Sequence, residues 1–142
     1  MVFREKIAWL SLAAMIVAYG IYFPLAEQAA ARGEATTPHL LVLLGGVLTV
    51  QALVVIVASI AMAIQSGRDA NAPADERDRL IARRGAAIAY FVLMVGMVSV
   101  GCVMPFYDQG WEIINAALFA LVIAEIVRYV VIVLSYRRGW HG

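Results

Sequence analysis

Four long apolar stretches alternate with short polar ones along this chain of 142 residues. Each stretch has about 20 residues or more, which at a rise of about 1.5 Å per residue is enough to cross a hydrocarbon core of about 30 Å. The pattern therefore predicts membrane-spanning helices at residues 7–25, 40–64, 87–106 and 113–134. Short connections between consecutive spans predict an antiparallel four-helix transmembrane bundle, all-α and with a single domain, residues 1–142.

The longest polar interruption is residues 68–84, RDANAPADERDRLIARR. Pro73 suits the first position of a helix, and the acidic residues that follow it favour the positive end of a helix dipole. We therefore expect a surface helix over residues 73–84. It either runs on into the third span or bends at Gly85.

Charged side chains of this helix are candidates for contact with a partner protein or with lipid headgroups. Arg79 lies four residues after Asp75 and three after Glu76, so both carboxylates are expected to reach its guanidinium. The candidate contact residues are Asp75, Glu76, Asp78, Arg79, Arg83 and Arg84.

Composition places the chain in a membrane, because 63% of its residues are hydrophobic and only 15% are charged. Soluble domains carry about a quarter charged residues. A lone cysteine, Cys102, excludes an intrachain disulfide and a cysteine-based metal cluster within one subunit. The two histidines, His39 and His141, are expected at opposite membrane surfaces. The sequence therefore predicts no metal site and no cofactor.

Basic residues are distributed unevenly over the two sides of the predicted bundle. Nine of the eleven lie before the first span, in the central loop or in the carboxy-terminal tail, whereas Arg32 alone lies on the other side and Arg128 lies within the fourth span. The positive-inside rule then places both termini and the central loop in the cytoplasm. Aromatic residues are expected at the inner interface (Trp9, Tyr90, Tyr136, Trp140) and at the outer one (Tyr22, Phe23, Tyr107, Trp111).

The first and third spans share a pattern at an offset of 81 residues. Gly20 and Pro24 match Gly101 and Pro105. A proline ring clashes with the carbonyl four residues earlier, so both pairs are predicted helix kinks. The match indicates two similar hairpins related by an axis along the membrane normal, and the alternative is coincidence.

Glu125 and Arg128 are charged residues inside the predicted fourth span. Each costs about 2.5 to 3.5 kcal/mol near a helix centre, and at a spacing of three residues they are expected to pair. One interpretation is a proton or ion site near the midplane, with Gln51 of the second span as a further member. The other is an ion pair that stabilises helix packing, with Arg128 extending toward the headgroups.

Neither a Ser-His-Asp set nor a glycine-rich phosphate loop is present, so the sequence predicts no catalytic residue and no enzyme. The leading hypothesis is a non-catalytic, homo-oligomeric scaffold or accessory subunit of a membrane complex. Small residues of the fourth span offer a surface for a partner helix: Ala116, Ala120 and Ala124. The alternative is a small proton- or ion-coupled transporter or channel subunit using Glu125, Arg128 and Gln51. Membrane lipid, a second copy or another membrane protein are the expected partners, and nucleic acid is not.

Three segments carry a resemblance to a known group of proteins: EKIAW at residues 5–9, DERDRLIARRG with AYFVLMVG within residues 75–96, and SYRRGWHG at the end of the chain. Together they resemble small, functionally uncharacterised bacterial inner-membrane proteins with four spans. The D-E-R-D-x-x-I block at residues 75–81 is the most specific part. The resemblance implies a multi-pass protein of the bacterial inner membrane and implies no activity.

Overall fold

The structure is a computed structural model that describes residues 3–67, 75–108 and 110–138. These residues form helices, turns and short connections, and no strand is found among them. All four long helices have the length and hydropathy to cross a membrane, which confirms the predicted all-α, four-span fold. The long helices are α1 (Phe3–Ala31), α2 (Thr37–Ser66), α3 (Glu76–Val98) and α4 (Trp111–Arg137).

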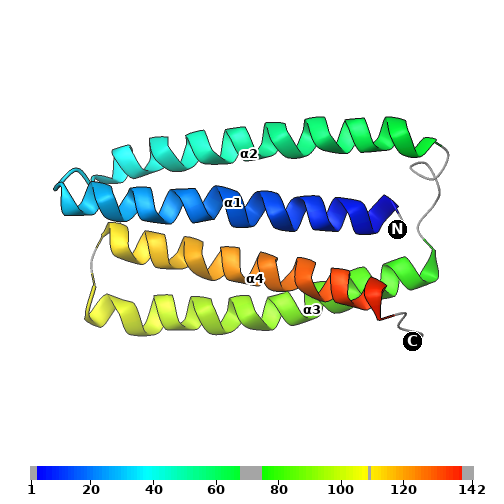
Figure 1. Ribbon diagram of the computed structural model, residues 1–142. Helices are drawn as coiled ribbons and strands as arrows, with labels where there is room; N and C mark the ends of the chain where they lie inside the picture. Colours follow the sequence, from blue (N-terminus) through cyan, green and yellow to red (C-terminus); the bar gives the residue numbers. More distant parts are fainter. Residues whose placement is uncertain (1–2, 68–74, 109, 139–142) are drawn as a thin grey trace.

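The helices pack in the order α2, α1, α4, α3 (Figure 1). Within this order α1 and α2 form one antiparallel hairpin, α3 and α4 form the other, and the hairpins meet where α1 packs against α4. The α3–α4 contact is the most extensive. Because α2 is held mainly along α1, and because α1 and α3 lie on different sides of α4, the arrangement leaves long helix faces uncovered by protein.

The start of α1, the start of α3 and the end of α4 lie at the same end of the molecule (Figure 1). This end, here called the basic end, carries Arg4, Arg83, Arg84 and Arg137. The connections between α1 and α2 and between α3 and α4 lie at the opposite end.

The connection between α1 and α2 is shorter than the predicted spans at residues 7–25 and 40–64 leave for it. Ala26 and Ala29 are buried, so α1 continues to Ala31 and only a few residues remain to join it to α2. Alanine has the highest helix propensity of all residues, which is the physical reason for the extension.

The surface helix expected at residues 73–84 is the first part of α3, and Pro73 lies outside the described residues. The α-helix begins at Glu76, with Asp75 as its N-cap, and runs without a break through Gly85. A Cβ at Gly85 would lie 3.0 Å from Ile132 Cγ1 and 3.2 Å from the Arg128 carbonyl oxygen. Gly85 therefore permits close packing of α3 against α4 instead of making a bend.

The two Gly-x-x-x-Pro motifs give different backbones. Pro24 lies inside α1, which continues for two further turns. At Gly101 and Pro105, in contrast, α3 passes into a π-helical turn (Ser99–Val103) and then a 3-10 turn (Met104–Phe106). The Met104 N–H donates to the Ser99 carbonyl, five residues earlier, so the register of the hydrogen bonds shifts just before the proline.

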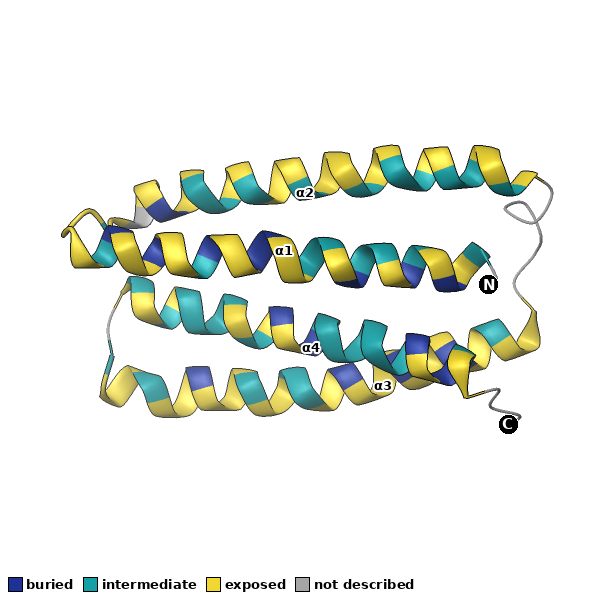
Figure 2. Cartoon of the chain, in the orientation of Figure 1, coloured by how far each residue is buried: buried dark blue, intermediate teal, exposed yellow. Residues whose placement is uncertain are grey.

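The main buried cluster lies where α1 meets α2 and α4, and α3 has buried residues of its own (Figure 2). Large apolar side chains are exposed on all four long helices. Such a surface is expected of helices that face lipid. Tyr22, expected at the outer interface, lies beside Trp111 near the end opposite the basic end, and its side chain turns inward. It is only 2% exposed, and its hydroxyl donates to Asn115 Oδ1 over 2.8 Å, because a phenol inside a bundle needs a hydrogen-bond partner.

Candidate functional site

Glu125 and Arg128 form the predicted ion pair, and its geometry is loose. Arg128 Nη1 lies 3.4 Å from Glu125 Oε1 and 3.3 Å from Oε2. Charge-assisted N–H···O bonds are usually about 2.7 to 2.9 Å long. The Arg128 Nε atom is buried and has no hydrogen-bond partner, and the guanidinium carbon lies 5.8 Å from the centre of the Tyr129 ring. Both members of the pair therefore keep unused hydrogen-bonding capacity.

Arg128 faces the gap between α1 and α3. Arg128 lines a cavity of about 420 Å³ whose walls are α1, α3 and α4, and Glu125 lies one turn along the same face of α4. Leu121, a further turn along, is 46% exposed, whereas Ala124 is buried. Neighbouring helices therefore cover α4 at Ala124 and leave it open at Leu121.

Arg128 lies between the middle of α4 and the basic end. It stands 17 residues after Trp111 and nine before Arg137, which correspond to about 26 Å and 14 Å. Its carbonyl oxygen packs beside Gly85, the residue that follows Arg84. Glu125 lies close to the middle of α4, and the longer side chain of Arg128 can extend from there toward the headgroup region.

At the end of the cavity nearest the basic end, Asp78 joins three helices. Its Oδ2 atom lies 3.2 Å from Arg4 Nε of α1, and its Oδ1 atom accepts a hydrogen bond of 2.6 Å from the Tyr136 hydroxyl of α4. Asp78 is also the third residue of α3, and its Oδ2 atom lies 3.4 Å from the Asp75 N–H. We call Arg4, Asp78 and Tyr136 the clasp.

The acidic residues around Arg79 have other partners than expected. Asp75 Oδ1 accepts from the Glu76 N–H over 2.7 Å, as an N-cap does, and Asp78 belongs to the clasp. Of the six candidate contact residues, those left with exposed side chains and no role in the clasp or the cap are Glu76, Arg79, Arg83 and Arg84.

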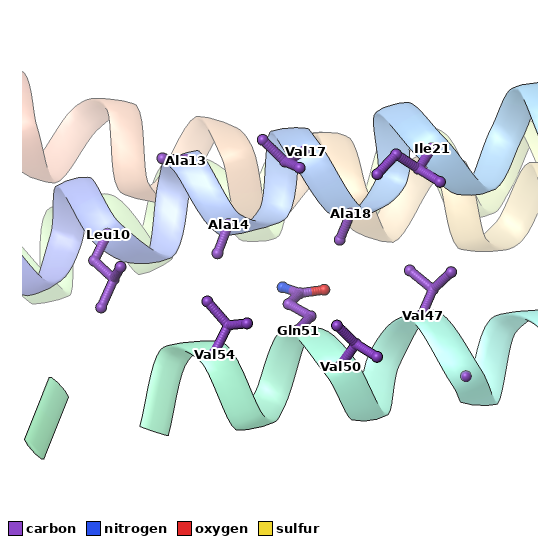
Figure 3. Close-up of a pocket in the computed structure, with 11 residues that line it drawn as sticks. Leu10, Ala13, Ala14, Val17, Ala18, Ile21, Val47, Val50, Gln51 and Val54 are labelled. Atoms are coloured by element: carbon purple, nitrogen blue, oxygen red, sulfur yellow. The ribbon is translucent and has the colours of Figure 1, made fainter. Parts of the chain in front are cut away.

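Gln51 lies in a groove of about 480 Å³ between α1 and α2 (Figure 3). Its side chain projects from α2 toward Ala14 and Ala18 of α1. The Oε1 atom is buried and has no hydrogen-bond partner. Because amide nitrogen and oxygen are assigned from their surroundings, the observation is that one end of the amide is unsatisfied.

The groove around Gln51 is lined by apolar and small residues. Gly46 contributes from α2 and Ala13, Ala14 and Ala18 contribute from α1. A Cβ at Gly45 or Gly46 would meet no neighbouring heavy atom within 4 Å, so neither glycine is needed for packing within the chain.

The structure does not bring the three expected intramembrane polar residues into one site. Gln51 faces α1 and lines the α1–α2 groove, whereas Arg128 lines the α1–α3–α4 cavity. Tyr129 lines that cavity and also a smaller one of about 240 Å³ that includes Gln51. Gln51 and Arg128 thus line separate cavities that meet at Tyr129.

The surface expected to receive a partner helix on α4 is used within the chain. A Cβ at Gly96 would lie 2.7 Å from the Ala120 Cβ, so α3 already covers that alanine, and Ala124 is buried as well. Small residues do mark a close contact between helices here, but the contacting helix, α3, belongs to the same chain.

A family model of predicted membrane proteins, DUF2178, matches residues 6–140. The chain belongs to this family. No curated protein and no solved structure matches the chain. The DUF2178 match covers both hairpins, the clasp except Arg4, and the Glu125–Arg128 pair, and it carries no assigned activity.

Two features of this DUF2178 chain escaped the sequence analysis. The clasp joins residues at positions 4, 78 and 136, and no spacing rule links residues so far apart. The hydrogen bond between Tyr22 and Asn115 is equally distant in sequence. Among residues 3–67, 75–108 and 110–138, no three His, Cys, Asp or Glu side chains are grouped as metal ligands would be.

Proposed function

We propose that the protein is a non-catalytic, homo-oligomeric scaffold or accessory subunit of a membrane complex. The observation that carries the proposal is the α1–α2 groove, in which the Gln51 amide has an unsatisfied end. The proposed occupant of the groove is α2 of a second copy of the same chain.

Small residues allow this close approach. Transmembrane helices gain little from the hydrophobic effect when they associate in lipid, so they pack where glycine and alanine let backbones come near. Gly45 and Gly46 have open space beside them, although glycine weakens a helix by about 1 kcal/mol relative to alanine. A partner helix at this position gives the glycines a packing role.

The amide favours a second copy over a lipid tail. Hydrocarbon offers neither a donor nor an acceptor, and an unpaired amide there is costly. An amide is itself both donor and acceptor. A two-fold axis along the membrane normal brings Gln51 of each copy to the same depth, where rotation about the side-chain bonds lets the two amides pair.

We further propose that the basic end lies in the cytoplasm and that the membrane is the bacterial inner membrane. Nine of eleven basic residues support the orientation by the positive-inside rule. The resemblance through residues 75–81 supports the location. We also propose that this D-E-R-D-x-x-I block is a family feature, because Asp78 at its fourth position holds three helices together.

Cysteine cross-linking tests the proposed interface in native membranes. With Cys102 replaced by serine, Val50→Cys, whose side chain lines the groove and is 62% exposed, is expected to form a disulfide-linked dimer under mild oxidation. Ile56→Cys is the matched control, because Ile56 is 54% exposed on another face of the same helix. Cross-linking of both positions to the same extent contradicts the proposal.

Replacing the amide tests its contribution. Gln51→Leu keeps a side chain of similar size and removes the hydrogen bonds, so the dimer in detergent is expected to weaken roughly 3- to 30-fold, the range for one interhelical hydrogen bond of about 0.6 to 2 kcal/mol. Analytical ultracentrifugation measures the dissociation constant. An unchanged constant, or a monomer at all concentrations of the wild type, rejects the interface.

A further inference from the structure

A cavity between α3 and the end of α4 lies at the basic end and shares no lining residue with the openings described above. Its volume is about 230 Å³. Sites for drug-sized ligands begin at about 300 Å³, so this cavity suits one chemical group of a larger molecule. Two helices supply its lining residues: Arg84, Ile88, Val131, Leu134, Ser135 and Arg138.

The polar and apolar residues of this cavity are separated along the direction that crosses the membrane. Arg84 stands three residues before the predicted third span, and Arg138 stands four residues after the predicted fourth span. Ile88, Val131 and Leu134 fall inside those spans. Val131 precedes Arg138 by seven residues of α4, so it lies about 10 Å deeper in the membrane. The arginines therefore lie on the surface side of the cavity and the apolar walls on the hydrocarbon side.

The surface side of the cavity is positively charged. Arg84 and Arg138 are both exposed, and no carboxylate side chain is found among the described residues that line the cavity. No acidic residue follows Asp78 on α3, and none follows Glu125 in the rest of the chain. Asp78 lies about 9 Å along α3 from Arg84 and is held in the clasp. The nearest negative charges in sequence thus lie outside the cavity.

The hydrogen-bond donors that the cavity offers to a ligand are those of the arginines. Ser135 also lines it, but its hydroxyl donates to the Val131 carbonyl oxygen over 2.7 Å, within α4. Each arginine carries five N–H donors in a planar arrangement, so one guanidinium can serve several acceptors at once. Phosphate oxygens match that arrangement well.

The apolar walls favour a lipid over a soluble anion. Ile88 is 37% exposed and Leu134 is 43% exposed, so both side chains remain open on the hydrocarbon side of the arginines. A soluble phosphate would contact only the arginine side. A phospholipid whose phosphate lies at the membrane surface carries its acyl chains toward the hydrocarbon, past these two side chains.

We propose that this cavity binds an anionic phospholipid, with the phosphate at Arg84 and Arg138 and the start of an acyl chain against Ile88 and Leu134. The headgroup then points out of the membrane and the chains point into it, as in the surrounding leaflet. The proposal requires that the basic end lies at a membrane surface. It depends neither on which side that surface faces nor on the proposed oligomer.

The charge of the cavity distinguishes anionic from zwitterionic phospholipids. Phosphatidylglycerol and phosphatidylcholine both have a phosphate, but the second also carries a fixed positive charge on its headgroup. That charge is repelled by two arginines and finds no carboxylate among the residues that line this part of the structure. Preference for phosphatidylglycerol therefore belongs to the two arginines together.

Native mass spectrometry of the delipidated full chain in detergent micelles tests the proposal, with each of these two lipids, matched in acyl chains, added in turn. The wild type is expected to bind one phosphatidylglycerol per chain about 25-fold more tightly than phosphatidylcholine, since each arginine near an anionic headgroup contributes about five-fold. Arg84→Gln and Arg138→Gln are each expected to reduce this preference about five-fold. The double variant is expected to show no preference.

Arg83→Gln is the matched control, because Arg83 is exposed beside Arg84 and does not line the cavity, and it is expected to keep the preference of the wild type. If one of the two arginine variants does not fold, the other decides. Equal binding of the two lipids by the wild type overturns the proposal, as does an equal loss of preference in Arg83→Gln, which would show attraction to the basic end in general. Glycerophosphoglycerol, the headgroup without acyl chains, is expected not to displace phosphatidylglycerol at equal concentration, and displacement overturns the assignment to a lipid.

Discussion

At Gly96, a neighbouring helix decides which residue type fits. The Cβ of an alanine there would lie 2.7 Å from the Ala120 Cβ, a distance that real Cβ atoms do not adopt. Gly20 has no neighbouring heavy atom within 4 Å of such a Cβ, although it also lies inside a long helix. Two glycines that look alike in the sequence therefore have different reasons to be glycine.

Gly96→Ala is expected to lower the free energy of unfolding by about 1 to 3 kcal/mol, because α3 and α4 must move apart to admit the methyl group. Gly20→Ala, its matched control, is expected to leave stability unchanged or raise it by up to about 1 kcal/mol, since alanine favours the helix. Thermal unfolding in the same detergent measures both. Equal effects of the two substitutions would show that the α3–α4 contact at Gly96 is looser than described.

At the level of the helices, α3 is positioned by its first turns as much as by its apolar part. Ile81 is only 1% exposed, and Gly85 and Ala89 continue the same buried stripe at intervals of four residues. The charged segment expected to lie on the surface is therefore packed against α4 along one side. The clasp completes this packing by joining α3 to α1 and α4.

Asp78→Asn is expected to destabilise the basic end by about 1 to 2 kcal/mol, because it removes the ion pair with Arg4 and weakens the bond from Tyr136, and the Arg4 side chain is 43% exposed. Hydrogen–deuterium exchange should then rise in the first turns of α1 and α3. Glu76→Gln, an exposed position in the same turn, is expected to leave exchange unchanged. If hydrogen–deuterium exchange is the same in Asp78→Asn and Glu76→Gln, the clasp does not contribute to stability.

For the molecule as a whole, the packing order α2, α1, α4, α3 decides which helix faces are left open. The number of spans alone does not decide this. A closed bundle covers the inner face of every helix, whereas here α2 is held mainly by α1. The proposed second copy would pack in the groove between α1 and α2.

The orientation of the whole molecule predicts which side a reagent must reach. With Cys102 replaced by serine, Tyr107→Cys, at a position 83% exposed, is expected to react with a membrane-impermeant maleimide on intact cells. Arg79→Cys is expected to react only after the cells are opened, because the proposed orientation places the basic end inside. The reverse pattern would contradict the proposed orientation while leaving the helix packing unaffected.

The sequence by itself determined the number, class and approximate places of the spans, because apolar length must match the thickness of the membrane. It also determined that Glu125 and Arg128 pair, since residues three apart on a helix are neighbours whatever surrounds them. Helix ends were less predictable: α1 runs on through an alanine-rich stretch, and identical Gly-x-x-x-Pro motifs give a continuous helix in one place and a π-helical turn in the other.

Only the tertiary structure decided which faces meet. The sequence could not reveal that Gly96 covers Ala120, that Gln51 and Arg128 line different openings, or that Asp78 joins Arg4 and Tyr136. The physical reason is that each helix is apolar nearly all round, so its pattern gives little sign of the side that turns inward. The choice follows from steric fit and from the pairing of a few polar groups far apart in the chain.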